Sequence, residues 1–157
     1  MSAAAADTVI VTAAVTRAAP SGEQLLIARR TAPEAIAGLW EFPGGKWEPG
    51  ETALDGVTRE LREELGVEVE IVGEVQAPGH PAFEPGAGWR LNEKAVMRLF
   101  QAVLPAGSTA APAPLQDHDR LDWVALDHTV LDYPWIPADL PIVRHMLNAH
   151  GGVAPDC

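Results

Sequence analysis

Pro43-Gly44-Gly45-Lys46-Trp47-Glu48-Pro49-Gly50-Glu51 runs directly into Thr52-Ala53-Leu54-Asp55-Gly56-Val57-Thr58-Arg59-Glu60-Leu61-Arg62-Glu63-Glu64-Leu65-Gly66-Val67, and this stretch decides the fold. A turn rich in proline and glycine precedes about three and a half turns of predicted helix. Thr52 suits the N-cap of that helix, and Gly66 suits its C-terminal stop. Because Val57, Leu61 and Leu65 recur at steps of four, one helix face should dock on an apolar core.

The predicted helix also carries a face of carboxylates. Residues three and four apart on a helix lie side by side, so Glu60, Glu63 and Glu64 share one face. Like charges this close repel by roughly 1 kcal/mol per pair in water, unless a cation or solvent screens them. A hard divalent ion such as Mg2+ is a natural neutraliser because it takes oxygen ligands and is shared between carboxylates and substrate phosphates. The alternative is a solvated acidic face paired with Arg59 and Arg62.

The spacing of the whole stretch decides between these readings. It is Gly45-x5-Glu51-x7-Arg59-Glu60-Leu61-x-Glu63-Glu64-x-Gly66-Val67, which resembles the signature of the Nudix hydrolases at every fixed position. The resemblance implies a loop-helix-loop that holds Mg2+, with Mn2+ as a substitute, and an enzyme that hydrolyses a nucleoside diphosphate linked to another moiety.

Length and composition limit what the chain can be. With 157 residues, 47% of them apolar, it suits one globular domain, which we expect over 7–150 between a disordered tail at 1–6 and a frayed tail at 151–157. The net charge of -11 is a poor match for a nucleic-acid polymer. No apolar run suits a membrane span and the start lacks a signal-peptide pattern, so we expect a cytoplasmic monomer or homodimer with no membrane partner. Cys157 is the single cysteine and is expected to be an exposed thiol.

The remaining elements predict an α+β fold. Strands are expected at 8–16, 23–30, 67–75, 94–104 and 121–126, the first two as a hairpin, with a short helix at 127–131 and a terminal helix at 137–150. The segment 76–90 reads as a long loop that serves as a lid or substrate edge. This order indicates helices layered on a mixed sheet, in agreement with the α/β/α sandwich of the Nudix fold.

The resemblance assigns roles within the signature. A phosphoanhydride is protected by its own negative charge, so hydrolysis needs charge neutralisation, an oriented water and a base. Carried over by position, Glu63 and Glu64 are the principal metal carboxylates, the Gly44 carbonyl is a backbone ligand, and Glu60 is a further ligand or the general base.

Three further positions of the signature have architectural roles. Gly45 is its fixed glycine, and Glu51 and Arg59 are expected to form an ion pair that ties the loop to the helix.

Segments outside the signature resemble the MutT-like branch, whose members act on nucleoside triphosphates. These segments are Ala28-Arg29-Arg30, Gly38 to Lys46, Asp117 to Trp123 and Pro137 to Pro141. The resemblance makes Arg30, Glu41 and Lys46 candidate substrate-binding residues, although Arg30 also suits a solvated strand end. Asp117 is a candidate extra metal ligand, with a charged hairpin tip as the alternative. The five histidines lack zinc-type spacing, so each is expected to be structural or solvated.

Asp139 is the candidate residue for reading the base. Oxidised-guanine enzymes of the MutT type carry an asparagine in this segment, and an amide both donates and accepts. An ionised aspartate only accepts, so it pairs best with an exocyclic amine such as cytosine N4. The sequence therefore favours cytosine nucleotides (dCTP, CTP, 5-methyl-dCTP). A buried, protonated Asp139 would donate, which keeps 8-oxo-dGTP as the main alternative, and a plain helix-capping role is the other.

Two other functions stay open. An ADP-ribose pyrophosphatase is one, because some of these carry a proline shortly after the signature, where this chain has Pro78, Pro81 and Pro85. A non-catalytic ligand sensor on the same fold is the other, but a sensor has no need of the repelling carboxylates.

Overall fold

The computed structural model describes residues 8–77, 88–108 and 111–151. The expected N-terminal tail, Cys157 with the residues before it from 152, and Pro78, Pro81 and Pro85 of the expected loop lie outside the described residues. Within the described part, no helix is long and apolar enough to cross a bilayer.

A mixed sheet forms the centre of the molecule, and β1 (Thr8–Ala19) lies in the middle of it. β1 pairs antiparallel with β2 (Gly22–Arg30) and parallel with β7 (Ala95–Val103). The outer neighbours are β3 (Trp40–Glu41) and β8 (His118–Ala125) on β2, and β5 (Glu70–Val75) and β6 (Trp89–Arg90) on β7. The short β4 (Gly44–Lys46) pairs antiparallel with β1. The predicted β1–β2 hairpin is confirmed.

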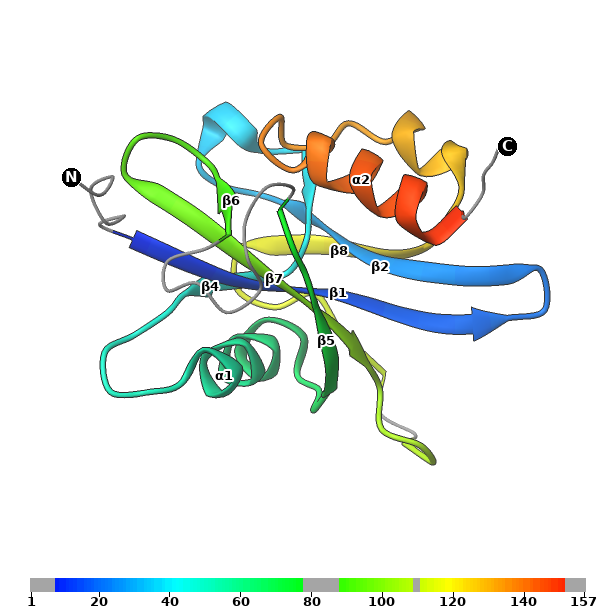
Figure 1. The fold of residues 1–157 in the computed structure, drawn as a ribbon, viewed down its shortest axis with the longest axis horizontal. Coiled ribbons are helices and arrows are strands. Elements are labelled where there is room, and N and C mark those ends of the chain that lie inside the picture. Colours follow the sequence, from blue (N-terminus) through cyan, green and yellow to red (C-terminus); the bar gives the residue numbers. More distant parts are fainter. Residues whose placement is uncertain (1–7, 78–87, 109–110, 152–157) are drawn as a thin grey trace.

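One helix covers each face of this sheet (Figure 1). Alternate residues of a strand point to opposite faces, so Val11, Ala13 and Val15 pack under α1 (Ala53–Leu65), while Ala14 belongs to the core beneath α2 (Leu140–Gly151). The two cores share the sheet and together make the predicted α/β/α sandwich.

The predicted limits of α1 are confirmed. The Thr52 side chain accepts a hydrogen bond from the Asp55 amide, and Gly66 ends the helix with φ of 71°. A left-handed cap of this kind favours glycine. The apolar face of Val57, Leu61 and Leu65 is fully buried.

The other helices and strands differ from the predicted ones at their ends. The terminal helix begins at Leu140 rather than at 137, and two short 3-10 helices occur at Glu34–Ile36 and His128–Asp132. β5 begins at Glu70, and β6 occupies the end of the expected 76–90 loop. β8 begins at His118 instead of 121 because it pairs with β2 as far as Arg30. The hairpin-tip reading of Asp117 to Asp119 is therefore wrong for His118 and Asp119, which lie in the sheet.

Candidate active site

The acidic residues of α1 divide into two buried carboxylates and one exposed one. Glu60 and Glu64 are 8% and 7% exposed, and they face the glycine turn that precedes the helix. Glu63 is exposed, with 45% of its side chain accessible. The three α1 carboxylates therefore share one stretch of helix surface but differ in environment.

Gly44 and Gly45 fit the turn closely against these carboxylates. The Gly44 amide donates a 2.9 Å hydrogen bond to Glu64 Oε1. A Cβ added at Gly45 would overlap the Glu60 carboxylate, and one added at Gly44 would overlap the backbone of β1. Glycine is required here because the backbone approaches both the helix and the central strand.

Arg59 is the principal cation beside the α1 carboxylates. Its guanidinium holds Glu51 through two hydrogen bonds of 2.9 and 3.1 Å, which confirms the predicted ion pair. It also donates to Glu60 at 3.1 Å and to Glu63 at 3.3 Å. A fifth bond, to the Lys46 carbonyl at 3.1 Å, attaches the helix to the end of β4. The Lys46 side chain itself is exposed.

The donor set around α1 fits a hard divalent ion by its chemistry. Carboxylates and a backbone carbonyl are the oxygen ligands that Mg2+ takes, and Gly45 places no side chain against the Glu60 carboxylate. Among the described residues, no three His, Cys, Asp or Glu side chains lie together as a preformed ligand group. The reason is local, since Glu60 and Glu63 point to Arg59 while Glu64 is bonded to the Gly44 amide.

A second group of polar residues, the Glu41 cluster, consists of Arg30, Glu41, His118 and Asp139. Arg30 Nη1 and His118 Nε2 lie 2.9 and 2.8 Å from the same oxygen of Glu41, Oε2. Arg30 Nε is held by the Ala32 carbonyl at 2.7 Å. Arg30 is therefore no solvated strand end, because its guanidinium is occupied within the cluster. Asp117 stands at the rim, with 66% of its side chain exposed and Oδ2 3.7 Å from Arg30 Nη2.

Asp139 belongs to this cluster rather than serving only as the residue before α2. Asp139 is 5% exposed, and its carboxylate accepts a 3.3 Å hydrogen bond from the Phe42 amide. Its backbone carbonyl accepts from the amides of Ile142 and Val143 at the start of α2. The side chain is thus directed at the segment between β3 and β4, next to Glu41.

Burial gives both regions carboxyl groups with unusual affinities for protons. Desolvation raises the pKa of Glu64 to about 7, against the opposing effects of His118 and the Gly44 amide. Desolvation likewise raises the pKa of Glu60, although Arg59 opposes the shift. The pKa of Asp139 rises to about 7, through burial first and the nearby charge of Glu41 second. The Phe42 amide is bonded to Asp139 and the Gly44 amide, two residues further along the chain, is bonded to Glu64, so the two regions are adjacent.

His118 is the residue that sequence reasoning missed, since the histidines were expected to be structural or solvated. Its neighbours Asp117 and Asp119 are exposed, so nothing local indicates burial. The relevant relation is long-range, in that Arg30 at the end of β2 pairs with His118 at the start of β8.

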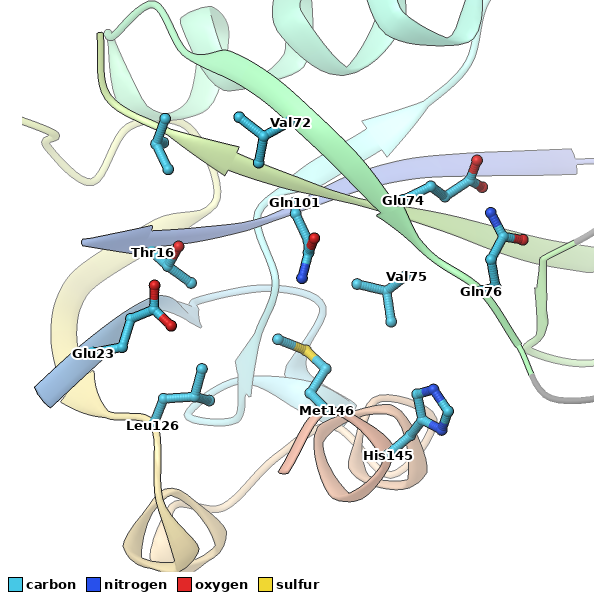
Figure 2. A pocket seen from close by; sticks show the side chains of 11 residues that line it. Thr16, Glu23, Val72, Glu74, Val75, Gln76, Gln101, Leu126, His145 and Met146 are labelled. Atoms are coloured by element: carbon cyan, nitrogen blue, oxygen red, sulfur yellow. The ribbon is translucent and has the colours of Figure 1, made fainter. Parts of the chain in front are cut away.

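A separate cavity of about 500 Å³ lies beneath α2, at the end of β1 away from Gly44. Figure 2 shows Thr16 and Gln101 from the sheet directed toward Met146 of α2. Among the residues that the structure describes, its lining includes two glutamates and no lysine or arginine. A site for a triphosphate needs positive charge or a metal, so this cavity does not suit the phosphates of a nucleotide.

Comparison with known proteins places this geometry in a family. A family model for the NUDIX domain matches residues 8–146. The chain belongs to the Nudix family.

Two relatives show which branch of the Nudix family this is. The chain is 33% identical over 150 residues to a Mycobacterium tuberculosis protein named "putative 8-oxo-dGTP diphosphatase 2", covering 94% of each chain. It is 38% identical over 121 residues to the CTP pyrophosphohydrolase of Escherichia coli, covering 77% of this chain and 80% of the relative. The solution structure of the E. coli ORF135 protein matches with a TM-score of 0.66 at 30% identity, over 93% of this chain and 94% of that one. This protein is thus a Nudix hydrolase of the MutT-like branch.

Proposed function

We propose that this Nudix hydrolase cleaves a (deoxy)nucleoside triphosphate to a nucleoside monophosphate and pyrophosphate, with Mg2+ or Mn2+ as cofactor. The observation that carries the proposal is the adjacency of the α1 carboxylates and the Glu41 cluster. One region has the oxygen ligands for a divalent ion that accompanies phosphates, and the other has buried acceptors that suit a base. A nucleotide joins these two chemistries in one small molecule.

The metal would be held by Glu60, Glu63, Glu64, the Gly44 carbonyl and Asp117. When bound, it would supply charge neutralisation for the phosphates and orientation for the attacking water. Arg59 would stay bonded to Glu51 and so hold the glycine turn in place. Glu60 and Glu63 could then rotate from the guanidinium toward the metal while the loop stays attached to the helix. Arg30 of the Glu41 cluster and Lys46 at the end of β4 are assigned to substrate binding.

Glu60 is either a ligand or the general base, and a metal titration separates these roles. If Glu60 is a ligand, Glu60→Gln raises the Mg2+ concentration needed for half-maximal rate. If it is the base, the same variant lowers kcat at saturating Mg2+ and leaves the metal requirement unchanged.

Recognition of the substrate base is assigned to Asp139 and Glu41. Both side chains are acceptors when ionised, which favours cytosine nucleotides through the exocyclic amine. The E. coli relative named as a CTP pyrophosphohydrolase supports this choice. The nucleotide preference then places the enzyme in adjustment or sanitation of the nucleotide pool.

One observation favours 8-oxo-dGTP as the second candidate substrate. The pKa of Asp139 is raised to about 7, so near neutral pH part of the population carries a proton that Asp139 donates. A donor beside an acceptor suits an oxidised guanine edge, and the mycobacterial relative carries the corresponding name.

A nucleotide panel with Mg2+, its products resolved by anion exchange, tests the proposal. It should contain dCTP, CTP, 5-methyl-dCTP, 8-oxo-dGTP and ADP-ribose. Pyrophosphate and a monophosphate are the expected products from the triphosphates, whereas orthophosphate as first product would contradict the proposed bond cleavage. ADP-ribose as the best substrate would replace the proposal with an ADP-ribose pyrophosphatase, and binding without turnover would indicate a ligand sensor.

A further inference from the structure

His118 is a buried member of the Glu41 cluster, and the proposed function gives it no task. Its side chain has no solvent exposure, and its Nε2 lies 2.8 Å from Glu41 Oε2. Its Nδ1 is the single buried side-chain nitrogen or oxygen in the described part of the chain without a hydrogen-bond partner. A buried polar atom of this kind is costly to retain, which calls for a reason beyond core filling.

The backbone fixes His118 between the two regions of the site. Just before it, the Ala113 and Leu115 amides donate to the Leu65 and Glu64 carbonyls at the end of α1, each at 3.0 Å. A turn follows in which Gln116 has φ of 53°, a left-handed conformation that is uncommon for a residue other than glycine. The Asp117 carbonyl then accepts from the Thr31 amide at 2.8 Å. The imidazole is therefore positioned by α1 on one side and by β2 on the other.

The hydrogen bonds at Glu41 are asymmetric. Arg30 Nη1 and His118 Nε2 both meet Oε2, and no described residue donates to Oε1. The Glu41 side chain keeps 15% exposure. Because a carboxylate beside a guanidinium only accepts, Nε2 must carry a hydrogen and donate it to Oε2. Two donors thus clamp one oxygen and leave the other as an accessible acceptor.

We propose that His118 is a positioning residue that holds Glu41 so that Oε1 faces a hydrogen-bond donor of the substrate. The inference rests on the proposed function, in which Glu41 contacts the nucleotide. His118 acts through its Nε2–H alone, and Arg30 is the second arm of the same clamp. The substrate group that faces Glu41 Oε1 is an amine or a hydroxyl, because a free carboxylate oxygen accepts hydrogen bonds from donors of these classes.

Two substitutions separate the two ring nitrogens. The side-chain amide of glutamine can place its nitrogen near the position of Nε2, whereas that of asparagine reaches only as far as Nδ1. His118→Gln therefore keeps the donor to Glu41, and His118→Asn removes it. His128→Gln is the matched control, because His128 is exposed and lies outside the site.

The kinetic test uses the best triphosphate of the nucleotide panel. His118→Asn is expected to raise KM about tenfold or more, with kcat changed less than about threefold, and His118→Gln to stay within about threefold of wild type in both. In a Glu41→Gln background, His118→Asn should have no further effect on KM, because the residue acts through Glu41. Equal losses in the Gln and Asn variants, or effects that multiply in the double variant, would overturn the proposal.

A second measurement is independent of activity. Imidazole nitrogen NMR of the wild-type protein without metal is expected to show His118 protonated at Nε2. The opposite tautomer would refute the clamp even in an active enzyme. If wild type hydrolyses no triphosphate while the Nε2–H tautomer is present, the proposed function fails and the clamp on Glu41 stands as a structural result.

Discussion

The α1 carboxylates and the Glu41 cluster are both acidic and partly buried, yet they are assembled in different ways. Glu60, Glu63 and Glu64 lie within five consecutive residues of one helix, where Arg59 of the same helix bonds Glu60 and Glu63 and the nearby Gly44 amide bonds Glu64. The Glu41 cluster draws on β2, β3, β8 and the residue before α2, joined by strand pairing and by the Phe42 amide. The chemistry common to a family is thus carried by a local motif, while the groups assigned to substrate choice depend on the whole sheet.

The largest expected effect comes from breaking the local region. Glu64→Gln and Glu63→Gln should each reduce kcat by orders of magnitude, because each deletes a proposed metal ligand. Their stabilities should differ, since Glu64 is buried with its pKa raised to about 7 and Glu63 is exposed. A raised carboxyl pKa means that folding is penalised as pH rises, and the penalty is complete above about pH 7.

Thermal unfolding in a chelator at pH 8 and pH 5 checks this difference. Glu64→Gln should stabilise the protein at pH 8 by about 1–3 kcal/mol and by less at pH 5, whereas Glu63→Gln should match wild type at both. If Glu64→Gln unfolds at a temperature well below that of wild type at pH 8, the ionised Glu64 carboxylate does not destabilise the fold.

Gly45→Ala tests how tightly the local region is built. A Cβ at this position would overlap the Glu60 carboxylate, so the variant should lose about 1–3 kcal/mol of stability by overpacking and most of its activity. Combining it with Glu60→Ala should restore the stability but not the activity. Chemical denaturation of the two single variants and the double variant measures this, and additive stability losses would contradict the predicted overlap.

A smaller effect, on stability, is expected from Asp139→Asn in the Glu41 cluster. Burial raises the pKa of Asp139 to about 7, so wild type carries a cost that grows as pH rises from about 4 to about 7. The amide removes that cost, and the variant should be more stable than wild type by about 1–3 kcal/mol at pH 8, with the difference vanishing near pH 4. A difference that is constant with pH would mean that Asp139 is ionised at little cost.

The smallest effect is expected at Asp119, the matched control for Asp139. This aspartate is next to His118 in β8 but faces outward, in an exposed ion pair with Arg29 at 2.9 Å. Asp119→Asn should change kcat/KM by less than about twofold for every substrate, as is usual for surface pairs. A larger change in steady-state kinetics would show that the site extends across this edge of the sheet.

The same contrast explains how much of the molecule the sequence predicts. The helix, its caps and its buried face follow from local periodicity, and the Glu51–Arg59 pair from the signature. The β1–β2 hairpin and the sandwich follow from strand patterns in order. The start of β8 does not, because it depends on pairing with Arg30, 88 positions away along the chain.

The Glu41 cluster was only partly predictable for this reason. Glu41, Arg30 and Asp139 were identified as candidates one at a time by resemblance, without any reason to place them together. His118 stands between two exposed aspartates, so its burial is decided by tertiary contacts alone. The division of the α1 carboxylates into buried and exposed members was also unpredictable, since helical spacing gives their common face but not the position of the glycine turn.

The most direct test of the account compares substrate ratios in the two regions. We would measure kcat/KM with Mg2+ for dCTP, 5-methyl-dCTP and 8-oxo-dGTP on wild type, Glu64→Gln and Asp139→Asn. The account predicts that Glu64→Gln lowers all three values by a common factor, whereas Asp139→Asn shifts the ratio toward 8-oxo-dGTP because the amide always donates. An Asp139→Asn enzyme with all three values changed equally, or a Glu64→Gln enzyme with an altered ratio, would contradict the division of the site into a hydrolytic region and a base-reading region.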